Sequence, residues 1–327
     1  MRNLFDHLNP KFPILNAGMG GGLAGAELAA AVNAGGGLGV VGAGAMPPAL
    51  IEGLVADTRK LTSKPIGANI IMPMSDGSDI EACFDAEVEV LVLFWGDPQP
   101  YVKDAHRRGM FVISQCGDAA DASACADAGV DAVIIQGTEA GGHVKATAPL
   151  QETLATTVAT LGNLPVIAAG GIATGQHIAT ALEAGAAGVS IGTRFVASQE
   201  ARALDEYKHR IVDATSSDTV FTQLFDIGWP NANHRVIRNS TYDQWEAAGE
   251  PDSGERPNEG EIVGTYQVGE QKIDIPRYAV YPAALEFSGD IEATALYAGE
   301  SVDNIDTVQS TAEIMDGLVA ELKTATA

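Results

Sequence analysis

Cysteine is scarce in this sequence, which contains three cysteines in 327 residues. Cys83, Cys116 and Cys125 are odd in number and lack the paired spacing of zinc ligands, so they predict neither a disulfide framework nor a metal site. Unpaired thiols fit a reducing compartment. We therefore expect a cytoplasmic protein without a bound metal.

Positive charge is the second shortage. The chain has 19 lysines and arginines against 43 aspartates and glutamates, which gives a formal net charge of -24. Such a charge repels phosphate backbones and anionic membrane surfaces, so we expect no nucleic-acid partner. The acid surplus fits either a high-salt environment or an ordinary acidic surface, and its concentration late in the chain favours the second.

The chain also lacks a long uninterrupted apolar run. The N-terminal "MRNLFDHLNPKF" has no apolar core of signal-peptide length, and the small-residue tract 17–50 is broken by Glu27, Asn33 and several glycines. We expect neither a targeting segment nor a membrane span.

The sequence does contain a regular alternation of two patterns over its first 200 residues. Short β-branched apolar runs alternate with segments of helical spacing, which is typical of βα units around a parallel sheet. Eight runs is the number of strands in a (β/α)8 TIM barrel, although the number alone leaves a doubly wound sheet open. The predicted strands are 12–19, 37–44, 64–71, 88–96, 110–116, 131–137, 164–171 and 187–193.

The segments between these strands have the spacing of helices. In 150–161, apolar residues recur every three or four positions and form one stripe. A last helix is predicted around Met315, where apolar residues from 308 to 322 keep a similar spacing. Glycines stand where four helices should end, as C-terminal caps do: Gly35, Gly109, Gly129 and Gly185.

The alternation breaks after the eighth predicted strand. Residues 215–290 are rich in acidic, Asn, Pro and aromatic residues and show no clear period. We predict a barrel domain of residues 1–200 and 291–327. Residues 201–290 should be an acidic helical and loop excursion that forms a lid or a small second subdomain over one mouth. For residues 249–262, a partly disordered loop is the alternative.

Aromatic residues of this excursion have two interpretations. Trp229, Tyr242 and Trp245 either shape the entrance to a site or pack the core of the excursion itself. We favour packing.

Glycine pairs follow the last two predicted strands. In a (β/α)8 barrel the active site is built by loops at the C-terminal ends of the strands. Gly170-Gly171 precedes a helix expected to begin near Thr174, and Gly192-Thr193 follows the next strand. Together they offer backbone N–H groups and a hydroxyl to a phosphate, which favours a phosphate site over the alternative of simple tight turns.

Other strand ends carry groups suited to a heterocycle. Met19, Asn69 and Gln115 offer backbone and amide groups, and the chain has no P-loop sequence. FMN is therefore the ligand that we favour, with a phosphosugar as the alternative.

One histidine stands out in "QGTEAGGH", residues 136 to 143. His143 follows two glycines on the predicted active face, and imidazole is the side chain best matched to proton transfer near neutral pH. Glu139 in the same loop could orient His143, bind a loop amide or face water. Cys116 also ends a strand, but we favour a small buried hydrophobe over a nucleophile.

These motifs, taken in order, resemble those of the nitronate monooxygenase family, formerly called 2-nitropropane dioxygenases. The resemblance rests on "PILNAGMGGGLAGAELAAAVNAGGGLGVVGAG", "IGAN", "GVDAVIIQGTEAGGH", "PVIAAGGIATG" and "GVSIGTRFVAS". It continues through "GWPNANHRVIRNS" to "LYAGESV" and so covers nearly the whole chain.

The resemblance implies an FMN-dependent barrel that oxidises alkyl nitronates with dioxygen to a carbonyl compound and nitrite. His143 would be the base that removes the α-proton of a neutral nitroalkane. The resemblance leaves the oligomeric state open, and a homo-oligomer is one possibility. The residues implied to contact the flavin are Ala17, Gly18, Met19, Asn69, Gln115, Gly141 and Gly142, and those implied to hold its phosphate are Ala169, Gly170, Gly171, Gly192 and Thr193.

Two positions depart from the family pattern. Many relatives have proline where this chain has Gly18, and the quinone-reducing branch often has lysine where Gln115 stands. The neutral amide favours the monooxygenase branch. The alternatives are an NAD(P)H-dependent quinone or enoyl-thioester reductase, since the latter enzymes share the Gly-Gly-His feature, and a non-catalytic flavin- or phosphate-binding barrel.

Overall fold

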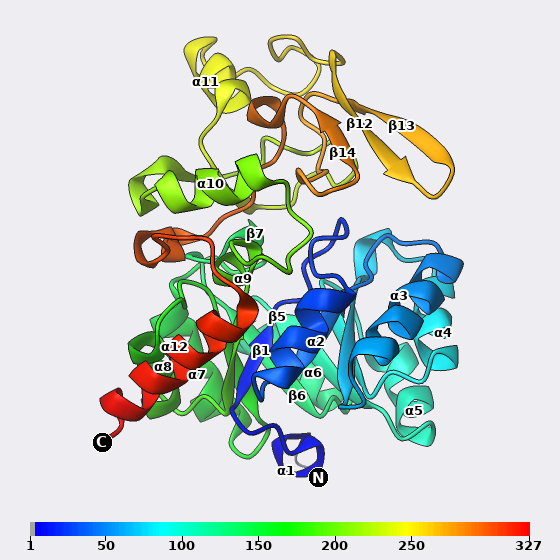
Figure 1. Ribbon diagram of the computed structural model, residues 1–327, viewed down its shortest axis with the longest axis vertical. Helices are drawn as coiled ribbons and strands as arrows, with labels where there is room; N and C mark the ends of the chain where they lie inside the picture. The colour runs from blue at the N-terminus through cyan, green and yellow to red at the C-terminus, as the bar shows by residue number, and fades with distance from the viewer. Residues whose placement is uncertain (1–3) are drawn as a thin grey trace.

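Eight parallel strands form the centre of the molecule (Figure 1), for which a computed structural model describes residues 4–327. The strands follow one another around the sheet in chain order, and its two edges meet where Leu15 pairs with Leu38. This closure confirms the (β/α)8 barrel and excludes the doubly wound sheet. The barrel strands are β1 (Ile14–Asn16), β2 (Gly39–Gly42), β3 (Ile66–Ile71), β4 (Val90–Phe94), β5 (Phe111–Cys116), β6 (Ala132–Gln136), β8 (Val166–Ala169) and β9 (Gly188–Ile191).

Each strand buries both of its faces, which explains the nearly continuous apolar runs. In β4, Val90 and Val92 point into the barrel, whereas Leu91 and Leu93 point toward the surrounding helices. At the N-terminal end of the strands, α1 (Leu4–Leu8) lies beneath the barrel, and Leu4 joins the interior cluster. The barrel is thus packed at one end, and any site must lie at the other.

Helices cover the outside of the barrel as the alternation predicts. Gly109, Gly129 and Gly185 have left-handed φ angles directly after helices, as C-terminal caps require, but after α2 it is Gly36 that has this conformation. Thr174 caps α8 by accepting a hydrogen bond from the His177 N–H. The helices are α2 (Ala26–Ala34), α3 (Pro48–Leu61), η1 (Met72–Met74), α4 (Ser78–Asp85), α5 (Gln99–Arg107), α6 (Ala119–Asp127), α7 (Leu150–Leu161) and α8 (Gly175–Glu183).

The place of the eighth barrel helix is filled by the last helix of the chain. α12 (Thr311–Ala325) packs against α8 and α2 and buries Ile314, Met315 and Leu318. A capping box between Ser310 and Glu313 fixes its first turn. More than a hundred residues therefore lie between β9 and the helix that completes its βα unit. In residues 4–327 no helix is both long and apolar enough to cross a membrane.

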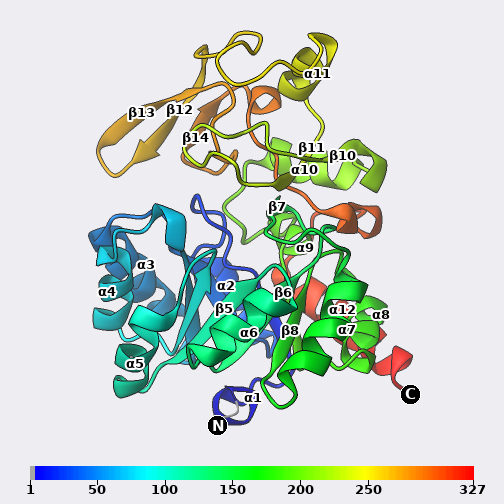
Figure 2. The same ribbon diagram turned by 180° about the vertical axis from the view of Figure 1, so that it is seen from behind.

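The intervening residues fold over the C-terminal mouth of the barrel (Figure 1). They contain the three-stranded antiparallel sheet β13-β12-β14, besides the helices and loops that we predicted. Two further strands of this segment, β10 and β11, form a second antiparallel sheet with β7, which lies in the barrel loop after β6. Figure 2 shows β10 and β11 above the strand ends. β7 comprises Gly142–His143. The elements between β9 and α12 are α9 (Thr193–Val196), α10 (Asp205–Asp213), η2 (Ser216–Asp218), β10 (Thr219–Thr222), β11 (His234–Ile237), α11 (Ser240–Ala247), β12 (Ile262–Val268), β13 (Gln271–Pro276), β14 (Phe287–Gly289), η3 (Ile291–Ala293) and η4 (Glu300–Asn304).

The polar stretch 249–262 is built around one arginine. The buried Arg256 guanidinium donates to Leu224 O at 3.0 Å and to Asp226 at 2.7 Å, and lies 4.3 Å from the centre of the Tyr278 ring. A buried cation with these partners ties an otherwise polar loop to the excursion.

Candidate active site

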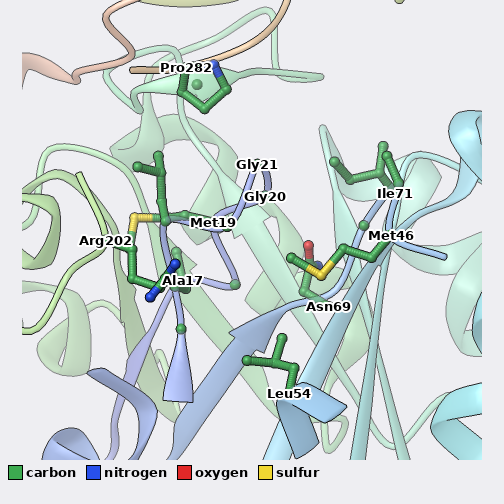
Figure 3. Close-up of a pocket in the computed structure, with 18 of the residues that line it drawn as sticks. Ala17, Met19, Gly20, Gly21, Met46, Leu54, Asn69, Ile71, Arg202 and Pro282 are labelled. Atoms are coloured by element: carbon green, nitrogen blue, oxygen red, sulfur yellow. The ribbon is translucent and has the colours of Figure 1, made fainter. Parts of the chain in front are cut away.

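A cavity of about 1280 Å³ opens at the C-terminal mouth of the barrel, between the strand ends and the excursion. Its floor is formed by residues of the barrel interior, among them Val40, Val92 and Ile134. Figure 3 shows the part of the cavity around Asn69, with Met19 and Met46 lining it and Pro282 above. Single small-molecule sites usually measure about 300–1,000 Å³, so this space exceeds the needs of one small ligand.

Most of the predicted site residues lie on this cavity. Three do not line it: Ala169, Gly170 and Gly171. An added Cβ at Gly170 would lie 3.2 Å from Ala140 N, so this glycine turn packs behind the loop that carries His143. The ten predicted residues that line the cavity are Ala17, Gly18, Met19, Asn69, Gln115, Gly141, Gly142, His143, Gly192 and Thr193.

The loop after β1 approaches its neighbouring strands too closely for larger residues. A Cβ at Gly18 would lie 2.2 Å from Asn69 Cβ. The Asn16 side chain fixes the start of this loop, because its amide donates to Val40 O at 2.7 Å and accepts from the Val40 N–H at 2.9 Å. Asn69 in turn donates to Val92 O at 3.3 Å. Gly18 therefore serves close packing here, which explains the departure from proline without loosening the loop.

At the end of β9, the Thr193 hydroxyl faces the cavity region. Its Oγ1 accepts a hydrogen bond from the Gly299 N–H at 3.0 Å, which leaves its own O–H able to donate. An added Cβ at Gly192 would lie 3.7 Å from Ala17 Cβ, so the β1 and β9 loops adjoin at this point.

The excursion positions the His143 loop. β7 pairs with β11, so that His143 lies opposite His234, and the Val144 N–H donates to Asn233 O at 2.7 Å. From the barrel side, the Gln136 amide donates to His143 O at 3.1 Å. The backbone of His143 is thus held from the barrel and from the excursion at once.

The His143 ring lies in an aromatic setting. It stacks on Trp229 with ring centres 4.1 Å apart, and the Tyr297 ring is 5.4 Å away. Its Nε2 is buried and has no hydrogen-bond partner among the described residues. Burial, and to a lesser degree the nearby His234, lower the pKa of His143 well below its ordinary value. The ring is therefore neutral at neutral pH and able to accept a proton.

His234 supports this neutral state. Its Nδ1 lies 2.9 Å from Ala232 O and its Nε2 accepts from the Phe225 N–H at 3.2 Å, so the backbone fixes the Nδ1–H tautomer. Burial lowers the pKa of His234 to about 4. A second positive charge is thereby kept away from His143.

Sequence reasoning did not place three aromatic residues beside His143, namely Trp229 and His234 of the excursion and Tyr297 beyond it. Trp229 has both of the roles that we considered, because it packs in a buried cluster with Phe94 and Ala232 and also lines the cavity, where it stacks on His143. Tyr242 and Trp245 pack against a core cluster of the excursion, as we favoured. His234 and Tyr297 were not singled out, because their spacing from His143 in the chain gives no sign of contact.

The open questions on Glu139 and Cys116 also have answers. Glu139 accepts from the Leu150 N–H at 2.9 Å and so binds the first amide of α7, rather than His143. Cys116 is fully buried with its Sγ 3.6 Å from Cys125 Sγ, and this contact and burial raise its thiol pKa. It is a packed hydrophobe and no nucleophile. Within residues 4–327 no group of three or more His, Cys, Asp and Glu side chains is placed to hold a metal.

Comparison with known proteins adds the family. The model of the nitronate monooxygenase family matches residues 2–90 and 78–321. The chain belongs to this family. It is therefore a flavin-dependent oxidoreductase that acts on a small molecule.

Proteins similar to this chain in sequence or structure have different described activities. The chain is 36% identical over 248 residues to a (3aS,4S,5R,7aS)-5-hydroxy-7a-methyl-1-oxo-octahydro-1H-indene-4-carboxyl-CoA dehydrogenase of Rhodococcus jostii (strain RHA1), covering 75% of this chain and 68% of the relative. FabK from Thermotoga maritima superposes with a TM-score of 0.81 at 31% identity, over 100% of this chain and 97% of that one. A nitroalkane oxidase from Streptomyces ansochromogenes gives a TM-score of 0.78 at 25% identity, over 96% of both chains.

Proposed function

We propose that this protein is an FMN-dependent nitronate monooxygenase that oxidises alkyl nitronates, and neutral nitroalkanes after proton removal, to a carbonyl compound and nitrite. The observation that carries the proposal is His143, a neutral imidazole whose buried Nε2 lies unpartnered among the described residues of the cavity. A neutral imidazole beside a bound substrate can accept a proton from carbon.

The residues of the cavity fit FMN. Two buried polar atoms, Gln136 Oε1 and His143 Nε2, have no partner among the described residues and would find one in a polar ligand. Asn69 and Gln115 would contact the ring system, and Gly192 and Thr193 the phosphate, with Gly170-Gly171 supporting the loop behind. When bound, FMN would accept one electron from the substrate and provide the chemistry with dioxygen.

Within this reaction the protein has three tasks. His143 Nε2 takes the α-proton of a neutral nitroalkane and holds it, while stacking on Trp229 fixes the ring plane. The apolar walls around Phe94 and Val92 exclude water from the reacting carbon. An anionic nitronate arrives without that proton, so it needs only to be bound and oriented.

We also propose that residues 201–290 act as the roof of the site, either as a lid or as a small second subdomain. Trp229 and His234 of this segment contact the His143 ring, which supports that role. Cytoplasmic location and self-association stay predictions, the first supported by three free, buried thiols.

The decisive variant is His143→Ala. We expect kcat/KM for a neutral nitroalkane to fall about 100-fold or more, because general-base catalysis typically contributes about 10² to 10⁴. Oxidation of the pre-formed nitronate should change far less. Oxygen uptake and nitrite release measure both, and His209→Ala, altered on the exposed face of α10, is the control. Wild-type protein loaded with flavin that consumes no oxygen with small nitronates would sink the proposal.

A second candidate is an NAD(P)H-dependent reductase of enoyl thioesters or quinones. It is favoured by the relative described as a carboxyl-CoA dehydrogenase and by a cavity too large for one small ligand. Anaerobic mixing with NADH separates the two. Rapid bleaching of the flavin favours the reductase, and slow or absent bleaching favours the monooxygenase.

A further inference from the structure

The cavity extends beyond the residues assigned to FMN. We call this extension the outer arm and define it by Met46, Ile273 and the α3 residues Leu50, Gly53, Leu54 and Leu61, with Met19 of the flavin-contact set at its neck. Figure 3 shows Met19 of the β1 loop on one side of the arm, and Met46 and Leu54 on the other. The outer arm runs without interruption into the chamber of His143, because both belong to one cavity.

Helix α3 has two apolar faces. Ile51, Val55 and Thr58 are buried against the barrel, as expected for a covering helix. A second stripe, Leu50, Leu54 and Leu61, recurs at intervals of four and seven and lines the outer arm, and its middle member Leu54 also packs partly against the barrel core. At about 1.5 Å per residue, this stripe is about 17 Å long. The core explains the first stripe and part of Leu54, but it leaves Leu50 and Leu61 uncovered.

Three apolar side chains of the outer arm are unusually exposed for this molecule. Leu50, Leu61 and Ile273 are 40%, 56% and 36% exposed, and they are three of the six large apolar side chains that are exposed in residues 4–327. All three line one cavity. Single exposed apolar residues need no explanation, but a gathering of them along a groove marks a binding surface.

The charges around the outer arm show which ligands it disfavours. Lys60 is paired with Asp57 at 2.7 Å and Arg202 with Glu286, and Glu27 adds a third carboxylate to the lining. Neither cation of the described lining is left for a ligand, and the carboxylates outnumber the cations. A polyanionic group such as a nucleotide phosphate is thus repelled. An uncharged aliphatic chain meets no such cost.

We propose that the outer arm binds the linear aliphatic chain of the substrate, so that the reactive carbon lies by His143 and an unbranched alkyl tail lies along α3. The reactive head of this substrate rests on the proposed function, whereas binding of the tail does not. Two flexible methionines at the neck of the arm, Met19 and Met46, suit a chain without fixed shape.

Gly53 gives a sharp test, because an added Cβ there meets nothing within 4 Å and would project into the arm. Gly53→Leu should fill the arm while favouring the helix. The matched control is Gly317→Leu, at an exposed helical glycine of α12 that also has open space around it.

The substrates are the nitronates of 1-nitrobutane and 1-nitrodecane. Burial of each added methylene strengthens binding about fourfold. Because the longer substrate has six more methylenes, kcat/KM of the wild type should rise about 100-fold or more from the shorter to the longer chain. Gly53→Leu should remove at least about tenfold of this preference and leave the shorter substrate unchanged. Gly317→Leu should behave as wild type. A flat response to chain length, or equal behaviour of the two variants, overturns the proposal.

A binding assay separates this proposal from the proposed reaction. The neutral dye N-phenyl-1-naphthylamine should be displaced by 1-dodecanol far better than by 1-butanol, and less well from Gly53→Leu. If the dye is displaced in this order while no nitronate is oxidised, the proposal of an aliphatic binding arm is supported and the proposal of a monooxygenase is rejected. A second copy of the chain could cover the outer arm in place of an aliphatic ligand. Analytical sedimentation of both variants tests for such a dimer. A dimer lost only in Gly53→Leu, with chain-length preference intact, overturns the proposal.

Discussion

At the scale of single residues, the site depends on side chains whose neighbours fix their charge and position. His143 owes its neutral ring to burial, and its orientation to Trp229 and the paired backbones of β7 and β11. His234 is held in one tautomer by two backbone groups. The chemistry of the cavity is thus fixed by contacts that lie outside the "QGTEAGGH" loop.

Buried neutral histidines make stability depend on pH. The pKa of His234 is lowered from 6.5 to about 4, so below pH 6.5 the unfolded chain binds a proton that the folded chain does not. Its contribution to stability is complete above pH 6.5 and is lost as the pH falls toward about 4. Between about pH 6.5 and about pH 5, this one group should cost about 2 kcal/mol of unfolding free energy.

Urea unfolding at these two pH values tests the assignment. His234→Gln should lose about 2 kcal/mol less than the wild type over this interval, whereas His209→Gln on exposed α10 should follow the wild type. Parallel losses in all three proteins would show that His234 is not a buried neutral group.

Gly18 shows what a single residue can and cannot reveal in sequence. Its neighbours in the chain mark a loop after a strand, which places it at the mouth of the barrel. The need for glycine comes from Asn69, fifty-one positions later, whose Cβ would lie 2.2 Å from an added Cβ. A close approach of this kind depends on the register of β1 to β3, which no local pattern encodes.

At the scale of elements, the barrel was predictable and the excursion only partly so. Each of the eight barrel strands lies within a run predicted from apolar residues, because burial on both faces leaves a strong signature. The strands β10 to β14 were not predicted. They are three to seven residues long. β11 is buried but has only two apolar residues, and the other four strands are partly exposed, so their apolar residues are too few to set a period.

The same limit applies to the site. Strand-end residues such as Asn69 and Gln115 could be placed from the alternation alone, since all barrel strands end at one mouth. Trp229, His234 and Tyr297 could not, because they gather around the His143 ring only in the folded chain, where β11 pairs with β7, a contact between segments about ninety residues apart.

Arg235 of β11 ties the loop that carries His143 to the excursion. Its side chain, 11% exposed, donates to Thr138 O at 3.0 Å and to Thr219 Oγ1 at 3.0 Å, and pairs with Glu300 at 3.0 Å. Arg235→Met should cost about 2–3 kcal/mol in urea unfolding, because it leaves buried acceptors unpaired. It should also lower kcat/KM by loosening the His143 loop.

Arg238 provides the matched control three residues along. It pairs with Asp243 and Glu246 but is 41% exposed, so Arg238→Met should cost no more than about 1 kcal/mol and leave kcat/KM unchanged. Equal costs for the two variants would contradict a structural tie through Arg235.

At the scale of the whole molecule, the net charge of -24 acts on the approach of the substrate. A nitronate is an anion and is repelled at long range, whereas a neutral nitroalkane is not. Raising the salt concentration from about 0.02 M to about 0.5 M shortens the screening length several-fold. We expect kcat/KM for a nitronate to rise with salt.

The neutral nitroalkane is the internal control for this experiment, because the same enzyme and the same cavity are used. Its kcat/KM should stay constant over the same salt series. Oxygen uptake measures both substrates. A fall for the nitronate with salt would mean that local positive potential at the mouth outweighs the net charge.

The position of α12 has a consequence for how the protein comes to be folded during synthesis. β1 pairs with β9, and α2 packs against α12, so the first βα unit waits for partners that are synthesised much later in the chain. Until then, one edge of β1 and one side of α2 have nothing to cover them, and such surfaces attract other chains. The excursion lengthens that interval, because its residues are made between β9 and α12. Full covering of the first βα unit thus waits until α12 has been synthesised, and a chaperone that shields β1 and α2 would act during this interval.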